Sequence, residues 1–288
     1  MTDRLLICTD LDRTLIPNGP QSESPHAREH FAALAARPEV TLAYVSGRHR
    51  ALVEKAIHNY RLPLPDYVVG DVGTTIYHVG PERDWLPQTA WEAEIARDWA
   101  GRNHADLKAL LQDLQDLRPQ ECAKQNNFKL SYYVPLQSDR NALSAVIRHR
   151  LTSAGVEANL IWSVDDPEGV GLLDILPARA SKYHAVEALM KLRSFTYDNT
   201  VFCGDSGNDI EVLASPIPAV MVANGQPDVQ ELARRLADEM GHGDQLYIAQ
   251  GGFMGMNGNY SAGILEGIAH YHPQTLDWMA FEATEGNA

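Results

Sequence analysis

Short apolar runs alternate with amphipathic stretches in the first third of the chain. Residues 5–10, 40–45 and 67–69 are apolar runs that predict buried strands, whereas residues 25–36 and 51–60 show helical periodicity. Strands that alternate with helices indicate βαβ units, in which the strands run parallel. The pattern therefore predicts an α/β fold whose core is a doubly wound, Rossmann-like parallel sheet.

This alternation stops after residue 82 and resumes near residue 178. The interval predicts helices at 91–99, 106–117 and 141–154 and strands at 128–134, 158–164 and 172–176. The last third predicts helices at 183–192 and 262–270 and strands near 200–203 and 219–222. We therefore predict a core domain of residues 1–82 and 178–288, with residues 83–177 inserted as an α+β cap domain that selects the substrate.

Two carboxylates one residue apart, Asp10 and Asp12, end the first apolar run, and Thr14 follows them. Ligands of open α/β sheets bind beyond the carboxyl ends of the strands. Two acids at that edge repel each other and lose hydration, which a divalent cation would compensate, and an aspartate held there can act as a nucleophile. Because Asp-x-Asp also occurs in turns and helix caps, the interpretation depends on the rest of the chain.

Three further polar groups stand where a doubly wound sheet would bring them to the same edge. They are Ser46-Gly47-Arg48 after the second apolar run, Lys182 at the start of a predicted helix, and Asp205, Asn208 and Asp209 after the run 200–203. Singly, these groups would also fit a turn, a solvated lysine and a polar loop. Their order along the chain, each in the expected context, favours one common site.

This set resembles the four signature motifs of the haloacid-dehalogenase-like phosphatases. Within that superfamily the chain is most similar to sucrose-phosphate phosphatases and mannosylfructose-phosphate phosphatase. The closer similarity rests on the segments DLDRT at Asp10, VGTTIY at Val72, KLSYYV at Lys129, LDILP at Leu173, CGDSGND at Cys203 and AGILE at Ala262. The resemblance implies a phosphoric monoester hydrolase that depends on Mg²⁺.

The resemblance also assigns roles to the residues. Asp10 would attack phosphorus and form an aspartyl-phosphate, while Asp12 would protonate the leaving sugar oxygen and later activate water. Mg²⁺, which prefers hard oxygen ligands, would bind the carboxylates of Asp10 and Asp205 and the backbone carbonyl of Asp12. We expect the pKa of Asp12 to be raised by apolar surroundings and a nearby substrate phosphate, because a general acid must hold a proton near neutral pH.

The remaining motif residues would support this chemistry. Ser46 and the amide of Gly47 would hold the phosphoryl oxygens, and Lys182 would neutralise their charge and orient Asp10. Thr14 would support the loop, and Asn208 and Asp209 would position Lys182 and metal-bound water.

Sugar contacts are expected from the predicted cap. Lys129 and Asp174 match positions where the family recognises sugar, although a lysine on a half-buried strand also fits a solvated, outward-facing residue. Arg48 is a further candidate for substrate binding, but its side chain and that of His49 could face substrate or solvent.

One position departs from the family pattern. Plant and cyanobacterial sucrose-phosphate phosphatases carry a glutamate where this chain has Thr75. Losing this carboxylate would leave phosphotransfer intact but could change sugar recognition. We expect a disaccharide phosphate as substrate, with sucrose 6-phosphate first and mannosylfructose phosphate or a broader range of sugar phosphates as alternatives.

Two other activities stay open. A sugar phosphomutase would use the same first step but retain its phosphosugar. From a different class, the chain could be a non-catalytic sugar-binding partner of a glycosyltransferase. That alternative predicts loss of catalytic residues, whereas the aspartates at 10, 12 and 205 and Lys182 are all present.

The composition mainly excludes certain classes of protein. A formal net charge of −14 argues against a protein that covers nucleic acid or an anionic membrane. No apolar stretch reaches the roughly 18 residues of a membrane span, and the chain enters its first predicted strand without a signal peptide. The glycine-rich segment 251–259 lacks the register of a phosphate-binding loop and predicts a flexible surface loop.

The cysteines and the resemblance bear on location and partners. Cys8, Cys122 and Cys203 do not suggest a disulfide framework, and Cys8 and Cys203 are predicted to be small buried hydrophobes in the sheet. We therefore expect a cytoplasmic protein that binds a small sugar phosphate. An association with a sugar-phosphate synthase is a further expectation.

Overall fold

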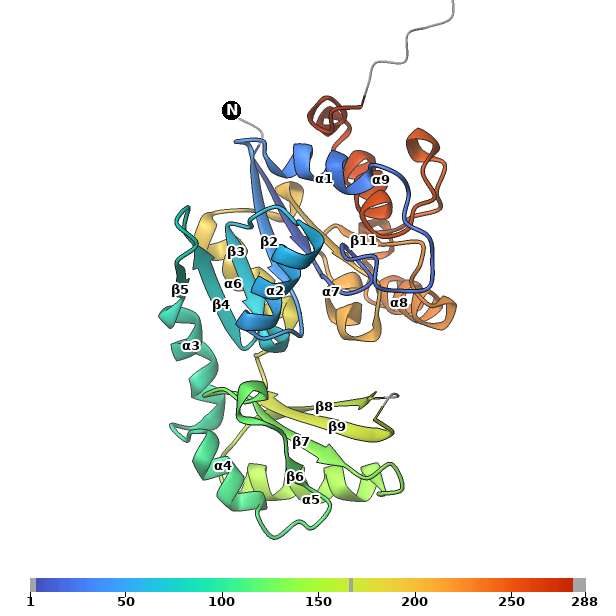
Figure 1. The fold of residues 1–288 in the computed structure, drawn as a ribbon. Helices are drawn as coiled ribbons and strands as arrows, with labels where there is room; N and C mark the ends of the chain where they lie inside the picture. The colour runs from blue at the N-terminus through green and yellow to red at the C-terminus, as the bar shows by residue number, and fades with distance from the viewer. Residues whose placement is uncertain (1–3, 166–167, 282–288) are drawn as a thin grey trace, which may run out of the picture.

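An eight-stranded mixed sheet forms the larger part of the protein in the computed structural model, which describes residues 4–165 and 168–281 (Figure 1). The strand order is β12-β11-β10-β1-β2-β3-β4-β5, in which β12 to β3 run parallel and β4 and β5 are antiparallel. The strands are β1 (Leu5–Thr9), β2 (Val40–Val45), β3 (Tyr67–Gly70), β4 (Thr75–Val79), β5 (Trp85–Pro87), β10 (Thr200–Gly204), β11 (Ala219–Met221) and β12 (Leu246–Ile248).

Helices cover both faces of this sheet, because successive residues of a buried strand point to opposite sides. Leu5 and Ile7 of β1 join one core cluster, whereas Leu6 and Cys8 join the other. The first face is covered by α1 (Ala27–Ala35), α2 (Arg50–Tyr60) and α9 (Ser261–Tyr271), and the second by α6 (Lys182–Arg193), α7 (Ile210–Leu213) and α8 (Pro227–Glu239). The predicted α/β, doubly wound fold class is confirmed.

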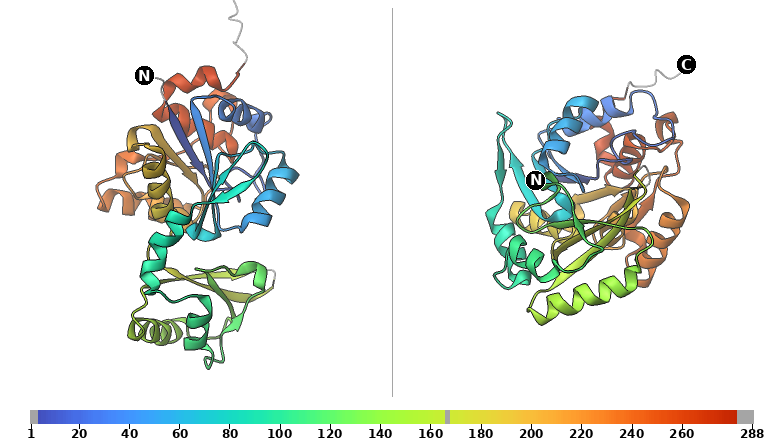
Figure 2. Two further views of the ribbon diagram at one scale, coloured as in Figure 1. Left: turned by 90° about the vertical axis from the view of Figure 1, so that its left-hand side faces the viewer. Right: turned by 60° about the horizontal axis from the view of Figure 1, so that its bottom comes forward.

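A second, antiparallel sheet lies below the first in Figure 1 and in the left view of Figure 2, with two helices on its far side. Its strand order is β6-β7-β9-β8, and α3 (Thr89–Ile95) leads into it from β5. The elements are α4 (His104–Leu111), β6 (Arg118–Pro119), β7 (Leu130–Val134), α5 (Arg140–Ser153), β8 (Ala158–Asp165) and β9 (Val170–Pro177). A separate core cluster, which includes Trp99, Leu107, Ile147 and Leu173, holds the two helices against the sheet. We refer to this layer as the cap.

Short 3₁₀ helices connect many of these elements. They are η1 (Asp71–Gly73), η2 (Ala96–Trp99), η3 (Cys122–Lys124), η4 (Tyr197–Asn199), η5 (Gly207–Asp209), η6 (Gly243–Gln245), η7 (Phe253–Gly255) and η8 (Pro273–Trp278). The glycine-rich segment 251–259 contains η7 and is anchored at one end, where Glu266 accepts a hydrogen bond from the amide of Gly251 at 2.9 Å.

The elements differ from the prediction at a few places. The helix predicted to reach residue 117 ends at Leu111, and the segments that form β4, β5, β6, β12, α7 and α8 were not recognised as strands or helices. The predicted domain boundary after residue 82 falls between β4 and β5, although β5 pairs with β4 in the larger sheet. The exact domain division stays a prediction.

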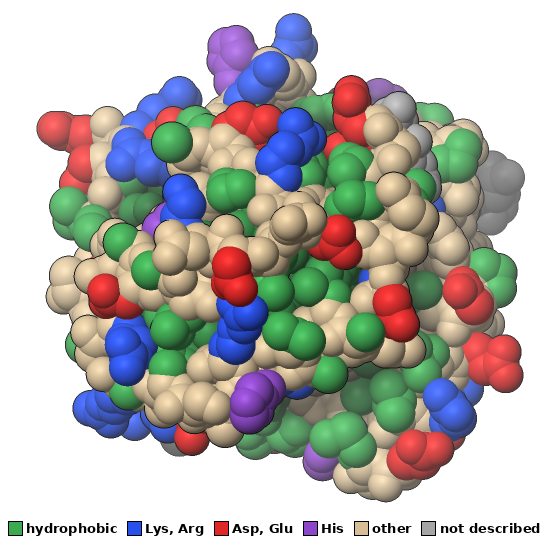
Figure 3. Space-filling model, turned by 90° about the horizontal axis from the view of Figure 1, so that it is seen from below, with side chains coloured by type: hydrophobic (Ala, Val, Ile, Leu, Met, Phe, Trp, Pro, Cys, Tyr) green, Lys and Arg blue, Asp and Glu red, His purple; other side chains and the backbone are tan. Residues whose placement is uncertain are grey.

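The charged surface, the cysteines and the helices bear on the expectations drawn from composition. Acidic and basic side chains are interspersed on the cap face shown in Figure 3, so that this face carries no continuous basic patch. Cys8 and Cys203 are buried free thiols, as predicted, and Cys122 is an exposed one. Over residues 4–165 and 168–281, none of the helices combines the length and the apolar character that crossing a bilayer requires.

Candidate active site

The carboxyl ends of neighbouring parallel strands bring the sequence motifs together. Asp10 follows β1, Ser46 follows β2 and Asp205 follows β10, and β1 lies between the other two strands. A cavity of about 360 Å³ opens beyond this edge, between the larger sheet and the cap. It is lined by Asp10, Asp12, Arg13, Ser46, Gly47, Arg48, His49, Leu52, Gln120, Lys124, Lys129, Leu172, Asp174, Asp205, Ser206 and Asn208.

A buried lysine connects the acids at the base of this cavity. The Nζ of Lys182, which is 2% exposed, lies 3.2 Å from Oδ1 of Asp10 and donates a 2.7 Å hydrogen bond to Oδ1 of Asp209. It also donates to Oδ1 of Asn208 at 3.0 Å. These are the contacts expected if Asn208 and Asp209 position Lys182.

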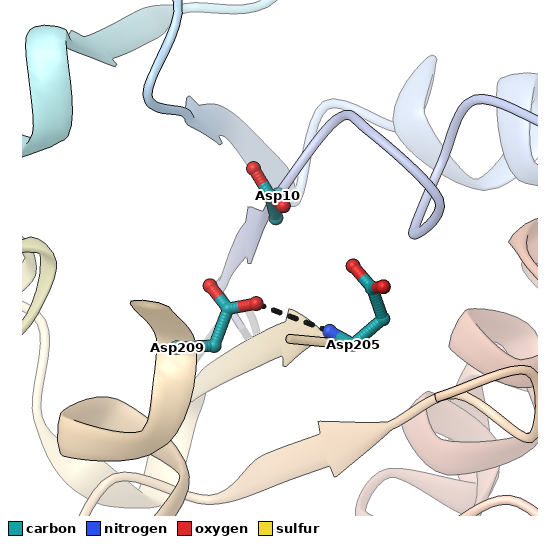
Figure 4. A group of neighbouring side chains, drawn as sticks. All are labelled: Asp10, Asp205 and Asp209. Carbon is teal, nitrogen blue, oxygen red and sulfur yellow. Dashed lines mark hydrogen bonds between the residues drawn. The ribbon is translucent and has the colours of Figure 1, made fainter. Parts of the chain in front are cut away.

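Figure 4 shows the carboxylates of Asp10, Asp205 and Asp209, which come from the ends of β1 and β10 and from the turn after β10. One oxygen from each lies within 4.8 Å of the others, and all three side chains are buried. Thr14 donates a 2.8 Å hydrogen bond to Oδ1 of Asp205, so its hydroxyl directly orients one acid of the cluster.

Burial and mutual repulsion perturb these acids strongly. Burial raises the pKa of Asp10 despite the opposing charge of Lys182, and Asp209 and Asp205 raise it further. Burial, followed by the charge of Asp209, raises the pKa of Asp205 to about 6. Burial disfavours the charged form of Lys182, but Asp10 and Asp209 outweigh it and raise its pKa. The three carboxyls at the base of the cavity would therefore carry more negative charge than Lys182 can offset.

Two of the three acids are better placed than the third to bind a cation. Oδ2 of Asp209 accepts hydrogen bonds from the amides of Asp205 and Ser206 and from the Ser206 hydroxyl, at 3.1 to 3.3 Å. Because Lys182 occupies its other oxygen, the carboxylate of Asp209 is already satisfied. Among the described residues, the carboxylate of Asp205 accepts one hydrogen bond, from Thr14, and has a distant contact with Arg13 at 3.8 Å. An all-oxygen, acidic donor set of this kind fits Mg²⁺.

Asp12 is held differently from the prediction. Nε and Nη2 of Arg48 donate hydrogen bonds of 2.6 Å to its two carboxylate oxygens, and Asn18 donates a third. Burial acts to raise the pKa of Asp12, but the hydrogen bonds and charge of Arg48 outweigh it, and the pKa is lowered. The expectation of a raised pKa is therefore wrong for the protein without substrate, because Arg48 faces Asp12 and not solvent.

The phosphate-binding and sugar-binding candidates also reach the cavity. Ser46 is buried, and its hydroxyl accepts a 3.3 Å hydrogen bond from the amide of Arg48 across Gly47. Lys129 and Asp174 line the cap side, where Nζ of Lys129 lies 3.6 Å from Oδ2 of Asp174. Thr75 instead lines a separate, smaller cavity of about 160 Å³ beside Asn126 and Phe128.

Several cavity residues were not recognised from the sequence. Gln120 and Lys124 come from cap segments that carry no motif, so no sequence signal marked them, whereas Leu172 directly precedes the LDILP motif on β9. Asp71, which contacts the cavity residue Lys129 at 3.7 Å, is different, because it directly follows β3 at the same sheet edge. Its position after a strand was the same signal that marked Asp10 and Asp205.

Comparisons with known proteins agree on one family. The model of the family described as sucrose-6F-phosphate phosphohydrolase matches residues 3–272. An HAD-like hydrolase of Nitrosococcus oceani, whose name gives no substrate, is 54% identical over 97% of this chain and 75% of its own length. Sucrose-phosphatase 1 of Nicotiana tabacum is 29% identical over 93% of this chain, which spans only 59% of that protein.

Two further similarities cover nearly the whole of both chains. Mannosylfructose-phosphate phosphatase of Agrobacterium fabrum is 28% identical over 92% of this chain and 96% of its own. The solved structure of the sucrose-phosphatase from Synechocystis, in complex with sucrose and phosphate, superposes with a TM-score of 0.72 at 27% identity. It covers 93% of this chain and 98% of that one.

Proposed function

The chain belongs to the sucrose-6F-phosphate phosphohydrolase family of haloacid-dehalogenase-like enzymes and is a phosphoric monoester hydrolase, and we propose that it hydrolyses the phosphate ester of a disaccharide. One observation carries the proposal. A single cavity is lined by the acids Asp10 and Asp12 on the core side and by Lys129 and Asp174 on the cap side. Phosphotransfer and sugar recognition can therefore act on one molecule.

In this proposal Asp10 is the nucleophile. Its carboxylate attacks phosphorus, the P–O bond to the sugar breaks, and an aspartyl-phosphate forms. Lys182, 3.2 Å away, orients this carboxyl and opposes the rise in its pKa that burial causes. Water then attacks the aspartyl-phosphate and regenerates Asp10 with release of inorganic phosphate.

Asp12 supplies and removes the protons. It protonates the leaving sugar oxygen in the first step and accepts the proton of the attacking water in the second. To do so it must gain a proton that Arg48 disfavours in the protein without substrate. A substrate phosphate that competes for Arg48 would remove this effect and raise the pKa of Asp12.

The phosphoryl group needs further positive or donating groups around its oxygens. Ser46, the amide of Gly47 and Arg48 lie on the cavity wall after β2 and are proposed to bind these oxygens. The carboxylates of Asp10 and Asp205 and the carbonyl of Asp12 would hold Mg²⁺, which neutralises phosphate charge when bound.

The choice among disaccharides rests on the cap. Lys129 and Asp174 together offer a donor and an acceptor, as sugar hydroxyls require, and both reach the cavity. We propose sucrose 6-phosphate as the first substrate, because the matched family model and the superposed structure are those of sucrose phosphatases. Mannosylfructose phosphate is its main competitor, because the phosphatase of that name is 28% identical over nearly the whole of both chains. A cytoplasmic location and an association with a sugar-phosphate synthase remain parts of this proposal.

The direct test is phosphate release from sucrose 6-phosphate with Mg²⁺, with and without a chelator, by the wild-type protein and by Asp10→Asn. We expect turnover that needs both the metal and Asp10. Sucrose as the sole sugar product would distinguish a phosphatase from a mutase. Absence of Asp10-dependent turnover from every sugar phosphate would favour a non-catalytic role.

A further inference from the structure

The segment Asp71–Gly73, directly after β3, has an unusual backbone. Asp71, Val72 and Gly73 all have positive φ angles, of 52°, 60° and 98°. The left-handed region is tolerated by glycine and aspartate, but a β-branched residue such as Val72 is strained there. Such strain persists only where the surroundings enforce it, and it is concentrated at functional positions.

The surroundings that enforce this backbone are the motif segments themselves. The amide of Asp71 donates to the carbonyl of Arg48 at 3.0 Å, and that of Val72 donates to the carbonyl of Ser46 at 3.2 Å. Gly73 packs so closely that a Cβ there would lie 2.4 Å from the carbonyl oxygen of Ser181, the residue before Lys182. The segment is thus fixed between the second and third motifs.

This backbone directs the carboxylate of Asp71 toward the cap. The side chain is 7% exposed, and its Oδ1 lies 3.7 Å from Nζ of Lys129. On the other side, the same Nζ lies 3.6 Å from Oδ2 of Asp174. A second contact joins the same two segments, because Nδ2 of Asn126 donates to Oγ1 of Thr74 at 2.9 Å. Asp71 is therefore the core's partner in the contact that brings Lys129 to the cavity.

The geometry leaves the hydrogen-bonding capacity of Lys129 unused. Both carboxylates lie beyond hydrogen-bond distance, and within residues 4–165 and 168–281 no acceptor receives a hydrogen bond from Nζ of Lys129. An ammonium group at similar distances from two carboxylates is attracted to both and, at these distances, forms a hydrogen bond with neither. Without the charge of Asp71, it would move to Asp174 and form a direct ion pair inside the cap.

We propose that Asp71 is a specificity-determining positioning residue, which holds the ammonium group of Lys129 in the cavity for the sugar hydroxyls of the substrate. The inference rests on the proposed function and adds to it a residue outside the motifs. It also accounts for Thr75, which lies away from this cavity. The core carboxylate that faces Lys129 comes instead from Asp71, four residues earlier in the same segment.

The test compares two substrates in Asp71→Asn, with sucrose 6-phosphate as the sugar substrate and p-nitrophenyl phosphate as an ester without sugar hydroxyls. Asparagine tolerates positive φ, so the backbone of the variant should be retained. We expect KM for sucrose 6-phosphate to rise about tenfold or more with kcat little changed, and both constants for p-nitrophenyl phosphate to stay within about twofold. Asp71→Gly, which also accommodates the backbone, should behave in the same way.

Two controls separate positioning from a structural effect. Asp66→Asn makes the same chemical change at the other end of β3, where the carboxylate accepts a bond from the amide of Leu42, and should leave the substrate ratio unchanged. In a Lys129→Met background, Asp71→Asn should cause no further rise in KM. Equal losses for both substrates, or independent effects of the two substitutions, would overturn the proposal.

The wild-type measurements distinguish this proposal from the proposed function. If the wild type cleaves p-nitrophenyl phosphate through Asp10 but no sugar phosphate, the substrate class is wrong and the role of Asp71 is rejected with it. If the wild type favours sucrose 6-phosphate and Asp71→Asn keeps that preference, only the role of Asp71 is rejected.

Discussion

The guanidinium of Arg48 donates two hydrogen bonds, each 2.6 Å long, to the carboxylate of Asp12. The pair joins the segments that follow β1 and β2, so the proposed general acid faces the second motif across the cavity. This arrangement stabilises the ionised form of Asp12 before substrate binds. It makes phosphate binding and protonation of Asp12 dependent on the same arginine.

Replacement of Arg48 by Met should therefore raise the pKa of Asp12 and weaken phosphate binding. The pKa rises because the opposing charge and both hydrogen bonds are lost while the carboxyl stays partly buried. NMR titration of the Asp12 carboxyl should show the rise, and KM for the phosphate ester should increase about tenfold.

Arg50→Met is the matched control, because Arg50 is exposed on α2, where it pairs with Glu54 and lies over the ring of Trp85, and it does not line the cavity. It should leave both quantities unchanged. An unaltered pKa of Asp12 in Arg48→Met would show that the pair does not control its protonation.

The buried ion pairs of Lys182 should make it essential for stability as well as activity. In Lys182→Met, Asp10 and Asp209 lose their buried counter-charge, and we expect the free energy of unfolding to fall by about 3–5 kcal/mol near neutral pH. Part of this loss should be recovered in acid. A carboxyl that is buried without a partner has a higher pKa in the native state than in the unfolded chain. The native state therefore becomes more stable as pH falls from the native pKa toward the unfolded pKa.

Urea unfolding across a pH range measures this effect. Lys191→Met, an exposed position on the same helix, should change stability by less than about 0.5 kcal/mol. A Lys182→Met protein as stable as the wild type near pH 7 would contradict the assigned charges.

The raised pKa of Asp205 predicts a metal effect that depends on pH. The pKa of Asp205 is about 6 in the folded protein, above the pKa of about 3.9 expected for an unfolded chain. Between these two pH values, the carboxyl is therefore protonated in the native state and ionised in the unfolded state. Without metal, this group's contribution to stability is present at lower pH and is lost as pH rises through about 6. A cation bound to the ionised carboxylate would reverse the loss.

Saturating Mg²⁺ should therefore raise the unfolding temperature more at about pH 7.5 than at about pH 5. Differential scanning calorimetry at both pH values provides the comparison, with Asp205→Asn as the variant that should lose most of the difference. Equal stabilisation at both pH values would indicate binding at a site that does not titrate in this range.

Glu266 provides a stability test away from the cavity. This buried carboxylate accepts hydrogen bonds from the hydroxyl of Tyr247 and from the amides of Gln250 and Gly251, at 2.8 to 2.9 Å. Glu266→Ala leaves these donors unpaired and should cost about 2–4 kcal/mol by urea unfolding. Glu231→Ala, on the exposed side of α8, should cost little, and equal effects of both would contradict the anchoring role.

The positions of the principal acids followed from the sequence, because a parallel sheet brings the carboxyl ends of its strands to one edge. Asp10, Ser46 and Asp205 each end an apolar run, and these runs form the neighbouring strands β1, β2 and β10. Lys182 was marked by its place at the start of a predicted helix, and it begins α6. The alternation of apolar and polar segments was sufficient for this part of the site.

What the sequence did not predict depends on contacts between distant segments. The lowered pKa of Asp12 requires Arg48 to face it, and nothing in the motif indicates the direction of that side chain. The role of Asp71 depends on a left-handed backbone that the sequence would assign to glycine, not to Val72. β12 was missed because this three-residue strand is short and only half buried.

The central claim is best tested by kcat/KM for phosphate release with Mg²⁺ from sucrose 6-phosphate, mannosylfructose phosphate, trehalose 6-phosphate, glucose 6-phosphate and fructose 6-phosphate, with Asp10→Asn as control. The proposed function predicts that one disaccharide phosphate exceeds both monosaccharide phosphates by at least about a hundredfold and that Asp10→Asn abolishes its turnover. Uniformly weak turnover of all five esters, or turnover that persists in Asp10→Asn, would contradict it.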